Sequence, residues 1–289
     1  MAEPSPKTFN IGGLAVHVFG TERLDAVLAN GKTPEVAVCF FAHGRMGRAE
    51  KIFHICQAIV SHPPSTPTSV VLVAAFDQRN HGSRLTEKRA NLAWTDGNEL
   101  HAYDMFAIHL TLNEHIIVRY GTAQDISYLA DVLPMYLNVS ISRWAVAGIS
   151  LGGHTALLTM ANDPRFTVCV CIIGCGDYTT LMRHRASSSP SISIYTTTLS
   201  THLLSLLSRV DPINNLSSFK GKALLFLGGA EDKLVPPSCN DSFFEGLRTV
   251  YKGEEEKFEV IMEGGVGHEV TAGMEGRCVE WVNRWIFKL

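Results

Sequence analysis

Ser150 stands in a glycine-rich segment, GISLGG over residues 148–153, which has the pattern Gly-x-Ser-x-Gly. An apolar stretch, 144–147, runs directly into this segment, and a stretch compatible with a helix, 155–161, follows it. A sharp turn between a strand and a helix lifts a serine hydroxyl above the sheet, at the positive end of the helix. Glycines suit so tight a turn because side chains would clash there. The pattern therefore predicts that Ser150 is a nucleophile, the alternative being an incidental serine in an ordinary turn.

His268 is the histidine best placed to activate this serine. A serine hydroxyl is a weak nucleophile until a base takes its proton, and the chain offers 12 histidines. His268 lies just after the last apolar run and just before a C-terminal segment with helical spacing. The loops at the carboxyl ends of strands are where the reactive groups of open α/β sheets gather. We therefore predict that His268 is the base, the alternative being a surface-loop histidine.

Such a base needs a carboxylate, which fixes its tautomer and stabilises its protonated form. Glu231 and Asp232 follow the apolar run 223–227, and either could serve, unless both belong to an acidic turn in solvent. The chain order serine, acid, histidine, with each residue in a loop at a strand end, favours a triad of Ser150, one of these carboxylates and His268.

The first long apolar run ends in the segment HGRMG over residues 43–47. A backbone N–H of this loop, together with that of Leu151, could bind the oxygen that becomes negative when a carbonyl is attacked. We expect Arg45 to be this donor, through its backbone and not its side chain. His43 is then a residue that braces the loop. The alternative is a plain glycine-containing loop.

Strands and helices alternate through most of the chain. Unbroken apolar runs indicate strands buried on both faces, as in a parallel sheet. Segments with helical spacing lie between these runs. The alternation predicts a three-layer α/β sandwich. The expected strands are 36–42, 70–76, 144–148, 166–173, 223–227 and 258–262, after a hairpin at 9–19, and the helical stripes begin near Ile52, Ile126, Phe243 and Cys278.

One stretch, 175–211, breaks this rhythm. It follows an expected strand but contains a serine-rich turn and a leucine-rich patch. We predict that 175–211 is a small lid or cap insertion over one end of the sheet. Residues 1–174 and 212–289 then form the core domain.

The composition is that of a globular protein, with 46% hydrophobic residues, 18% charged residues and a formal net charge of -3. No run of Lys or Arg supports nucleic-acid binding, and no stretch approaches the roughly 20 apolar residues that span a bilayer. The N-terminus lacks the apolar region of a secretory signal. The seven cysteines include no Cys-x-x-Cys pair, so we expect reduced core thiols. We therefore expect a soluble, cytoplasmic protein with a small-molecule substrate and no nucleic-acid or membrane partner.

Five segments together resemble the α/β-hydrolase superfamily, and they span almost the whole chain. They are 43–44, 77–82, 148–153, 229–236 and 267–268. The resemblance implies an eight-stranded, mostly parallel sheet and the chemistry of a serine hydrolase. It also places the acid at Asp232 instead of Glu231, and it implies neither a metal nor an organic cofactor.

One of these segments departs from the superfamily pattern Asp-x-Arg-Gly-x-Gly-x-Ser. Residues 77–84 read DQRNHGSR, so Asn80 replaces the first glycine and Arg84 replaces the serine. Asn tolerates left-handed backbone angles, so we expect the turn to survive. The departure indicates a divergent branch, which resembles a group of fungal, esterase-like hydrolases.

The leading hypothesis is an esterase-like enzyme that cleaves a carboxylic ester, or a related acyl bond, of a small to medium substrate through an acyl-Ser150 intermediate. A lactonase, a peptidase, an acyltransferase or a C–C hydrolase could use the same triad, and fold alone does not separate them. A binding protein without catalysis is disfavoured because no triad member is missing. Four residues could line an apolar acyl pocket, with ordinary packing as the alternative: Met105, Phe106, Tyr178 and Met182.

Overall fold

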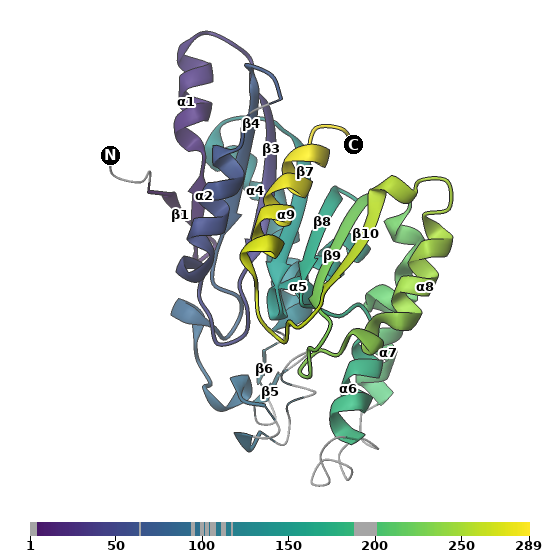
Figure 1. The fold of residues 1–289 in the computed structure, drawn as a ribbon. Helices are drawn as coiled ribbons and strands as arrows, with labels where there is room; N and C mark the ends of the chain where they lie inside the picture. The colour runs from purple at the N-terminus through teal and green to yellow at the C-terminus, as the bar shows by residue number, and fades with distance from the viewer. Residues whose placement is uncertain are drawn as a thin grey trace.

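One eight-stranded sheet, in the order β1-β2-β4-β3-β7-β8-β9-β10, organises the computed structural model of the protein (Figure 1). The structure describes residues 5–63, 65–93, 96–98, 101, 104, 108–110, 114–116, 118–187 and 201–289. β1 pairs antiparallel with β2, and β2 with β4, whereas β4, β3, β7, β8, β9 and β10 are parallel to one another. This confirms the predicted mostly parallel sheet. The strands are β1 (Lys7–Ile11), β2 (Leu14–Phe19), β3 (Glu35–Ala42), β4 (Ser69–Ala75), β7 (Ile141–Ile149), β8 (Phe166–Ile172), β9 (Ala223–Gly229) and β10 (Phe258–Glu263).

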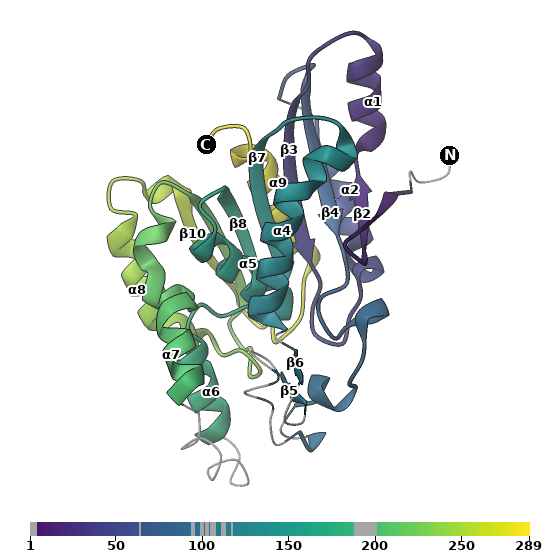
Figure 2. The same cartoon turned by 180° about the vertical axis from the view of Figure 1, so that it is seen from behind.

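Helices cover both faces of this sheet, which confirms the three-layer sandwich. On one face α2 (Phe53–Ser61) and α9 (Ala272–Trp285) pack side by side (Figure 1). On the other face lie α4 (Arg119–Leu137), α5 (Leu151–Asn162) and α8 (Asp241–Val250) (Figure 2). Each face has its own cluster of buried apolar side chains, and α1 (Thr21–Ala29) adds two residues to the cluster that contains α4 and α5.

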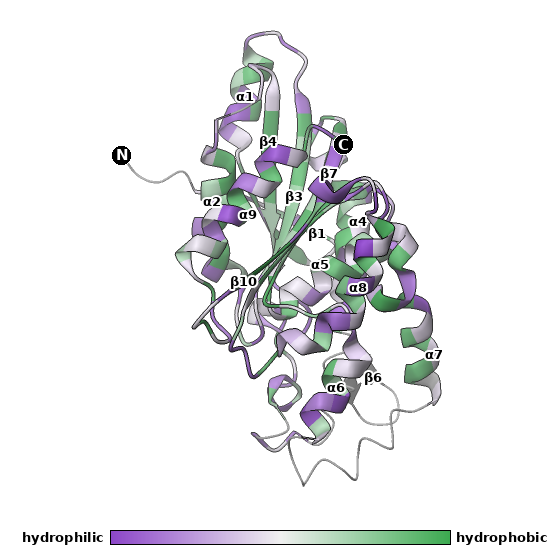
Figure 3. Cartoon of the chain, turned by 45° about the vertical axis from the view of Figure 1, so that its right-hand side comes forward, coloured by the Kyte–Doolittle hydropathy of each residue, from purple (hydrophilic) through white to green (hydrophobic). Residues whose placement is uncertain are grey.

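The apolar strands explain this arrangement. Figure 3 shows hydrophobic residues along the central strands, and helices that carry hydrophilic residues on part of their surface. In β3, every residue after Glu35 is buried, because helices cover both faces of the sheet there. Short 3-10 helices connect the main elements at Ala49–Ile52, Gly82–Arg84, Arg89–Asn91, Pro212–Phe219, Pro237–Asn240 and Glu255–Lys257.

The stretch 175–211 contains α6 (Tyr178–Ser187) and α7 (Thr201–Val210), which the sequence analysis did not predict as helices. Both views of the ribbon place them beyond the carboxyl ends of the parallel strands, at the same end as the short antiparallel pair β5 (Ile108–Leu110) and β6 (Glu114–Ile116) (Figures 1 and 2). The role of this stretch as a lid stays a prediction. Across the described residues, no helix is both long and apolar enough to cross a membrane.

Candidate active site

Ser150 lies in the turn between β7 and α5, where its backbone φ is 52°. This value falls in the left-handed region, which residues with side chains rarely adopt. The Ser150 N–H donates a hydrogen bond of 2.8 Å to the Ile172 carbonyl of the neighbouring strand β8, and this bond fixes the turn against the sheet. Backbone strain of this kind persists only where the surroundings enforce it, and it is concentrated at functional sites.

Gly148 and Gly152 allow the turn to form because they lack side chains where backbone segments lie close together. A Cβ atom on Gly152 would clash with the Ala42 carbonyl at the end of β3, and one on Gly148 would clash with the backbone of Gly152. The partners in both clashes are backbone atoms of the central sheet and the turn, so they cannot rotate away. The glycines of the motif therefore provide the room that the sequence analysis predicted.

Ser150, His268 and Asp232 lie in series within hydrogen-bonding distance. The Oγ atom of Ser150 is 2.9 Å from Nε2 of His268, and Nδ1 of His268 is 2.7 Å from Oδ2 of Asp232. An ionised carboxylate only accepts hydrogen bonds, so Nδ1 carries the proton and Nε2 is left to accept the serine hydroxyl. The structure thus brings together three residues from the loops after β7, β9 and β10.

Asp232 and its neighbour Glu231 differ in environment. The Asp232 side chain is 2% exposed, and its Oδ1 accepts the backbone N–H groups of Leu234 and Val235 at 2.8 Å each. A buried carboxylate is costly unless it is hydrogen-bonded, and these bonds also orient the second oxygen towards His268. Glu231 is exposed. The geometry therefore favours Asp232 as the partner of the histidine.

The loop after β3 lies against the serine. A Cβ atom added to Gly44 would lie 3.8 Å from the Cβ atom of Ser150. The backbone N–H groups of Arg45 and Leu151 donate no hydrogen bond to any other described residue, and Leu151 is at the positive end of α5. The Arg45 side chain donates from Nη1 to the Asn91 carbonyl at 3.0 Å. Both backbone donors are free to bind an oxyanion, and this role stays a prediction.

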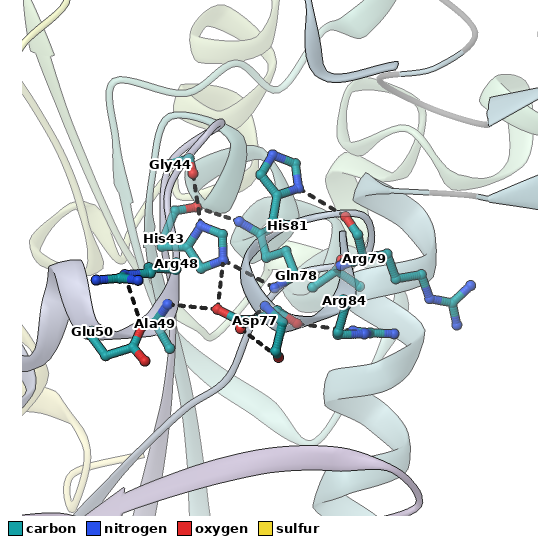
Figure 4. A network of polar contacts seen from close by, with 12 residues as sticks. His43, Gly44, Arg48, Ala49, Glu50, Asp77, Gln78, Arg79, His81 and Arg84 are labelled. Atoms are coloured by element: carbon teal, nitrogen blue, oxygen red, sulfur yellow. Dashed lines mark hydrogen bonds and ion pairs between the residues drawn. The ribbon is translucent and has the colours of Figure 1, made fainter. Parts of the chain in front are cut away.

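His43 connects the loops after β3 and β4 (Figure 4). Its Nε2 accepts the Gln78 N–H at 3.1 Å, its Nδ1 is 2.8 Å from the Gly44 carbonyl, and the Gln78 side-chain amide donates to the His43 carbonyl. Burial lowers the pKa of His43, which keeps the ring neutral and able to accept at Nε2. His43 therefore braces the loop that carries Arg45.

The divergent turn after β4 survives the loss of its glycine, as predicted. Asn80 has a φ of 58°, in the left-handed region. Its side-chain oxygen accepts the N–H groups of Thr86 and Glu87 at 3.1 and 2.9 Å. Arg84 donates from Nη1 to the Asp77 carbonyl at 3.0 Å, so the arginine closes the turn from the other end.

The predicted pocket residues are only partly described. Met105 and Phe106 lie outside the described residues. Tyr178 and Met182 are 1% and 2% exposed, and they belong to the apolar cluster that contains Leu151, beside the Ser150 turn. Their positions are those of packed side chains, and contact with a substrate stays a prediction.

The sequence analysis missed a pocket beside the loop of Arg45. This pocket has a volume of about 310 Å³, and its walls come from the loops after β3 and β4. The only signal in the sequence was that both loops follow adjacent strands, since the orientation of loop side chains has no periodic pattern. The lining residues are Met46, Gly47, His81, Gly82, Leu85, Lys88, Asn91 and Leu92.

Metal ligands and thiols are the other groups that could do chemistry in this protein. In the described ranges, no group of three or more His, Cys, Asp or Glu side chains is placed to hold a metal ion. All seven cysteines are free and buried. Burial raises the pKa of the Cys175 thiol, and that of Cys239 to about 11, so these thiols of the Leu151 cluster stay protonated and are poor nucleophiles. Ser150 is thus the best-placed nucleophile.

Comparison with known proteins agrees with this geometry. The sequence profile of the prolyl oligopeptidase family matches residues 119–287. YitV of Bacillus subtilis, whose name marks it as a candidate esterase, is 24% identical over 148 residues, which are 50% of this chain and 58% of YitV. The chain therefore matches little more than half the length of this curated relative.

Solved structures with the same fold come from several organisms. TT1662 from Thermus thermophilus has a TM-score of 0.66 at 19% identity and covers 98% of both chains. A puromycin-hydrolyzing peptidase from Mycobacterium tuberculosis has a TM-score of 0.61 at 15% identity, over 99% of this chain and 40% of that one. At such identities the likeness shows the α/β-hydrolase fold alone. These relatives give no support to a fungal branch. Because the matched profile covers more than half of the sequence, the chain belongs to the prolyl oligopeptidase family.

Proposed function

We propose that the protein is a serine hydrolase, which cleaves a carboxylic ester or a related acyl bond of a small to medium-sized molecule through an acyl-Ser150 intermediate. The observation that carries the proposal is the series of hydrogen bonds from Ser150 through His268 to Asp232, at 2.9 and 2.7 Å. Membership of a hydrolase family supports it, and the esterase name of YitV favours an ester.

The proposed reaction has two halves. His268 takes the hydroxyl proton as the Ser150 oxygen attacks the carbonyl carbon, and the N–H groups of Arg45 and Leu151 bind the oxygen that becomes negative. The C–O bond to the alcohol then breaks, and His268 gives its proton to the departing oxygen. In the second half water attacks the acyl-enzyme, His268 takes and returns a proton in the same way, and the acid is released.

A peptidase is the second candidate, because the family profile and the Mycobacterium tuberculosis structure carry peptidase names. The two activities use the same proposed triad, so they differ in the leaving group that the site accepts. Matched p-nitrophenyl esters and p-nitroanilides of one acyl group separate them. Turnover of the anilides at a rate comparable to that of the esters would favour the peptidase.

The proposed nucleophile is tested by labelling with a fluorophosphonate probe, which reacts with activated serines. We expect one adduct on Ser150, located by intact mass and peptide mapping, and hydrolysis of p-nitrophenyl esters. Ser150→Ala should take no adduct and should lose turnover by at least about 10³-fold, with unchanged unfolding free energy to within about 1 kcal/mol. Full activity in Ser150→Ala would overturn the proposal.

We also propose a lid role for 175–211 and a cytoplasmic location. The lid is supported by α6 and α7, which lie beyond the carboxyl ends of the strands, where the loops of the three residues gather (Figure 1). The location is supported by the seven free, buried cysteines, since unpaired thiols are typical of a reducing compartment. The proposed partner is a small-molecule substrate.

A further inference from the structure

The pocket beside the Arg45 loop begins one residue from a proposed oxyanion donor. Met46 and Gly47 directly follow Arg45 and form one wall. Met46 has a φ of 59° and is 68% exposed, so the chain holds a large apolar side chain in a strained conformation at the pocket mouth. Leu85 and Leu92 supply further apolar surface.

The size of the pocket limits what it can hold. Its volume of about 310 Å³ is at the small end of the range for ligand pockets in proteins. An aromatic ring on a short chain is a group of this small size.

The order of the strands in the sheet determines which part of an ester can lie in the pocket. Ser150 follows β7, and His268, which must reach the leaving oxygen, follows β10 on one side of β7. The pocket is built from loops after β3 and β4, on the other side of β7. The leaving alcohol must lie near His268, so the pocket on the opposite side is available to the acyl group.

His81 provides an unsatisfied acceptor among the pocket residues. The ring is 2% exposed, and its Nδ1 lies 2.9 Å from the Arg79 carbonyl, which can only accept, so Nδ1 carries the proton. Nε2 is then a bare acceptor, and no residue in the described part of the chain hydrogen-bonds to it. Figure 4 shows this nitrogen turned away from the network of His43 and Gln78.

The side-chain amide of Asn91 does not satisfy this nitrogen. Asn91 exchanges hydrogen bonds with Asn80, from Nδ2 to the Asn80 carbonyl at 2.6 Å and from the Asn80 Nδ2 to its Oδ1 at 3.1 Å. Burial lowers the pKa of His81 to about 4, so the ring stays neutral at neutral pH. A buried acceptor without a partner is costly. Among the described residues that line the pocket, only His81 carries such an unsatisfied acceptor.

We propose that this pocket binds the acyl group of the substrate, and that the acyl group is apolar with a hydroxyl or N–H donor that hydrogen-bonds to Nε2 of His81. The inference rests on the proposed ester hydrolysis and names its substrate class. A bare acceptor selects donors, so a methoxy or carboxylate group at the same position gains nothing from His81.

Three kinds of p-nitrophenyl ester test the donor: hydrocinnamate, its hydroxy ring derivatives and its methoxy ring derivatives, the last two as meta and para isomers. We expect kcat/KM for the better hydroxy isomer to exceed that for hydrocinnamate and for the matching methoxy ester by about ten-fold, the gain from one hydrogen bond. His81→Leu should remove this preference. His81→Gln, whose amide oxygen can accept, should retain part of it.

The pocket itself is tested by filling it. Leu85→Trp should lower the ratio of hydrocinnamate to acetate turnover by about ten-fold, because the indole occupies the space of the acyl ring. Leu28→Trp, on α1, is the matched control, because Leu28 and Leu85 are 43% and 40% exposed. The control should leave the ratio unchanged.

A binding measurement separates this inference from the proposed function. Ser150→Ala protein is titrated with the amides of the same acids, and the ring ¹⁵N resonance of His81 is followed, assigned by its loss in His81→Gln. A shift with the hydroxy amide and not with the methoxy amide supports the inference even if no ester is hydrolysed. Equal turnover of the three kinds of ester with no selective shift overturns it, whereas adduct formation on Ser150 would leave the proposed function standing.

Discussion

Two carboxylates stand next to each other in the loop after β9, and their environments differ. Asp232 is buried, accepts two backbone N–H groups and lies 2.7 Å from His268, whereas Glu231 points to solvent. A charge matters most to a neighbouring ring when water is excluded between them. At this scale, burial and hydrogen bonding separate a proposed functional group from a surface charge of the same type.

This difference gives a matched pair of substitutions. Asp232→Asn keeps the shape but removes the negative charge, so His268 loses its preferred tautomer and its protonated form is less stable. We expect kcat/KM for a p-nitrophenyl ester to fall on the order of 10³-fold. Glu231→Gln should change it less than about two-fold, by the usual size of surface effects. Similar losses in both variants would contradict the assignment.

The glycine pattern and the order of the loops predicted that Ser150, Asp232 and His268 lie together, and the structure places them within hydrogen-bonding distance, whereas their catalytic roles stay predictions. The sequence could not predict the pocket or the unsatisfied nitrogen of His81. Those depend on side-chain hydrogen bonds between loops, such as the pair Asn80 and Asn91, which leave no period in the sequence.

Among the elements, α6 is tied to the loop that carries Asp232. Arg185 on α6 donates from Nε and Nη2 to the Leu234 carbonyl at 3.2 and 2.9 Å, and its Nη1 lies 3.1 Å from Nε2 of His101. The Leu234 N–H in turn donates to Oδ1 of Asp232. Hydrogen bonds through Leu234 thus link this helix to the proposed acid.

Arg185 is thus a positioning residue, which acts through Leu234. Arg185→Met keeps an unbranched apolar stem and removes the guanidinium donors, so the acid loop can shift. We expect kcat to fall about ten-fold with a smaller change in KM, since small misplacements of catalytic groups are costly. Arg183→Met, at an exposed position of the same helix, should have little effect on ester kinetics. An unchanged kcat in Arg185→Met would show that this link is not needed.

The strands of the eight-stranded sheet were predicted to within a few residues because buried parallel strands form unbroken apolar runs, whereas the short strands β5 and β6 were missed. The helices α1, α6 and α7 were missed. In α7 the buried residues Leu203, Leu207 and Val210 do recur at helical spacing, but the serine-rich stretch before them obscured the pattern. Helical periodicity is weak evidence over so few turns.

Across the whole molecule, buried histidines couple stability to pH. Burial lowers the pKa of His43, lowers that of His81 to about 4 and lowers that of His101 to about 3. In the unfolded chain a histidine titrates near about 6.5. Between these values the unfolded chain binds more protons than the folded one, so the free energy of unfolding falls as the pH falls.

We therefore expect urea unfolding to show a steady loss of stability from about pH 6.5 towards about pH 4, with little contribution from these groups above that window. His81→Gln removes one of the groups that must stay neutral, so its stability should fall less steeply over the same window. The comparison is between the slopes of the unfolding free energy against pH in the two proteins, and not between their stabilities at neutral pH. Parallel slopes would show that His81 is not neutral in the folded protein.

The family profile matches residues 119–287, and these include Ser150, Asp232 and His268, whereas the pocket is formed by residues 46–92. The proposed triad and most of the pocket lining thus come from separate stretches of the gene, whereas Arg45, the proposed oxyanion donor, adjoins the pocket. Relatives can inherit the same reaction while their preferred substrates diverge through changes in two loops. For directed evolution, a library confined to the pocket lining, with His43 and Arg45 kept, would vary the proposed acyl site and leave Ser150, Asp232 and His268 unchanged.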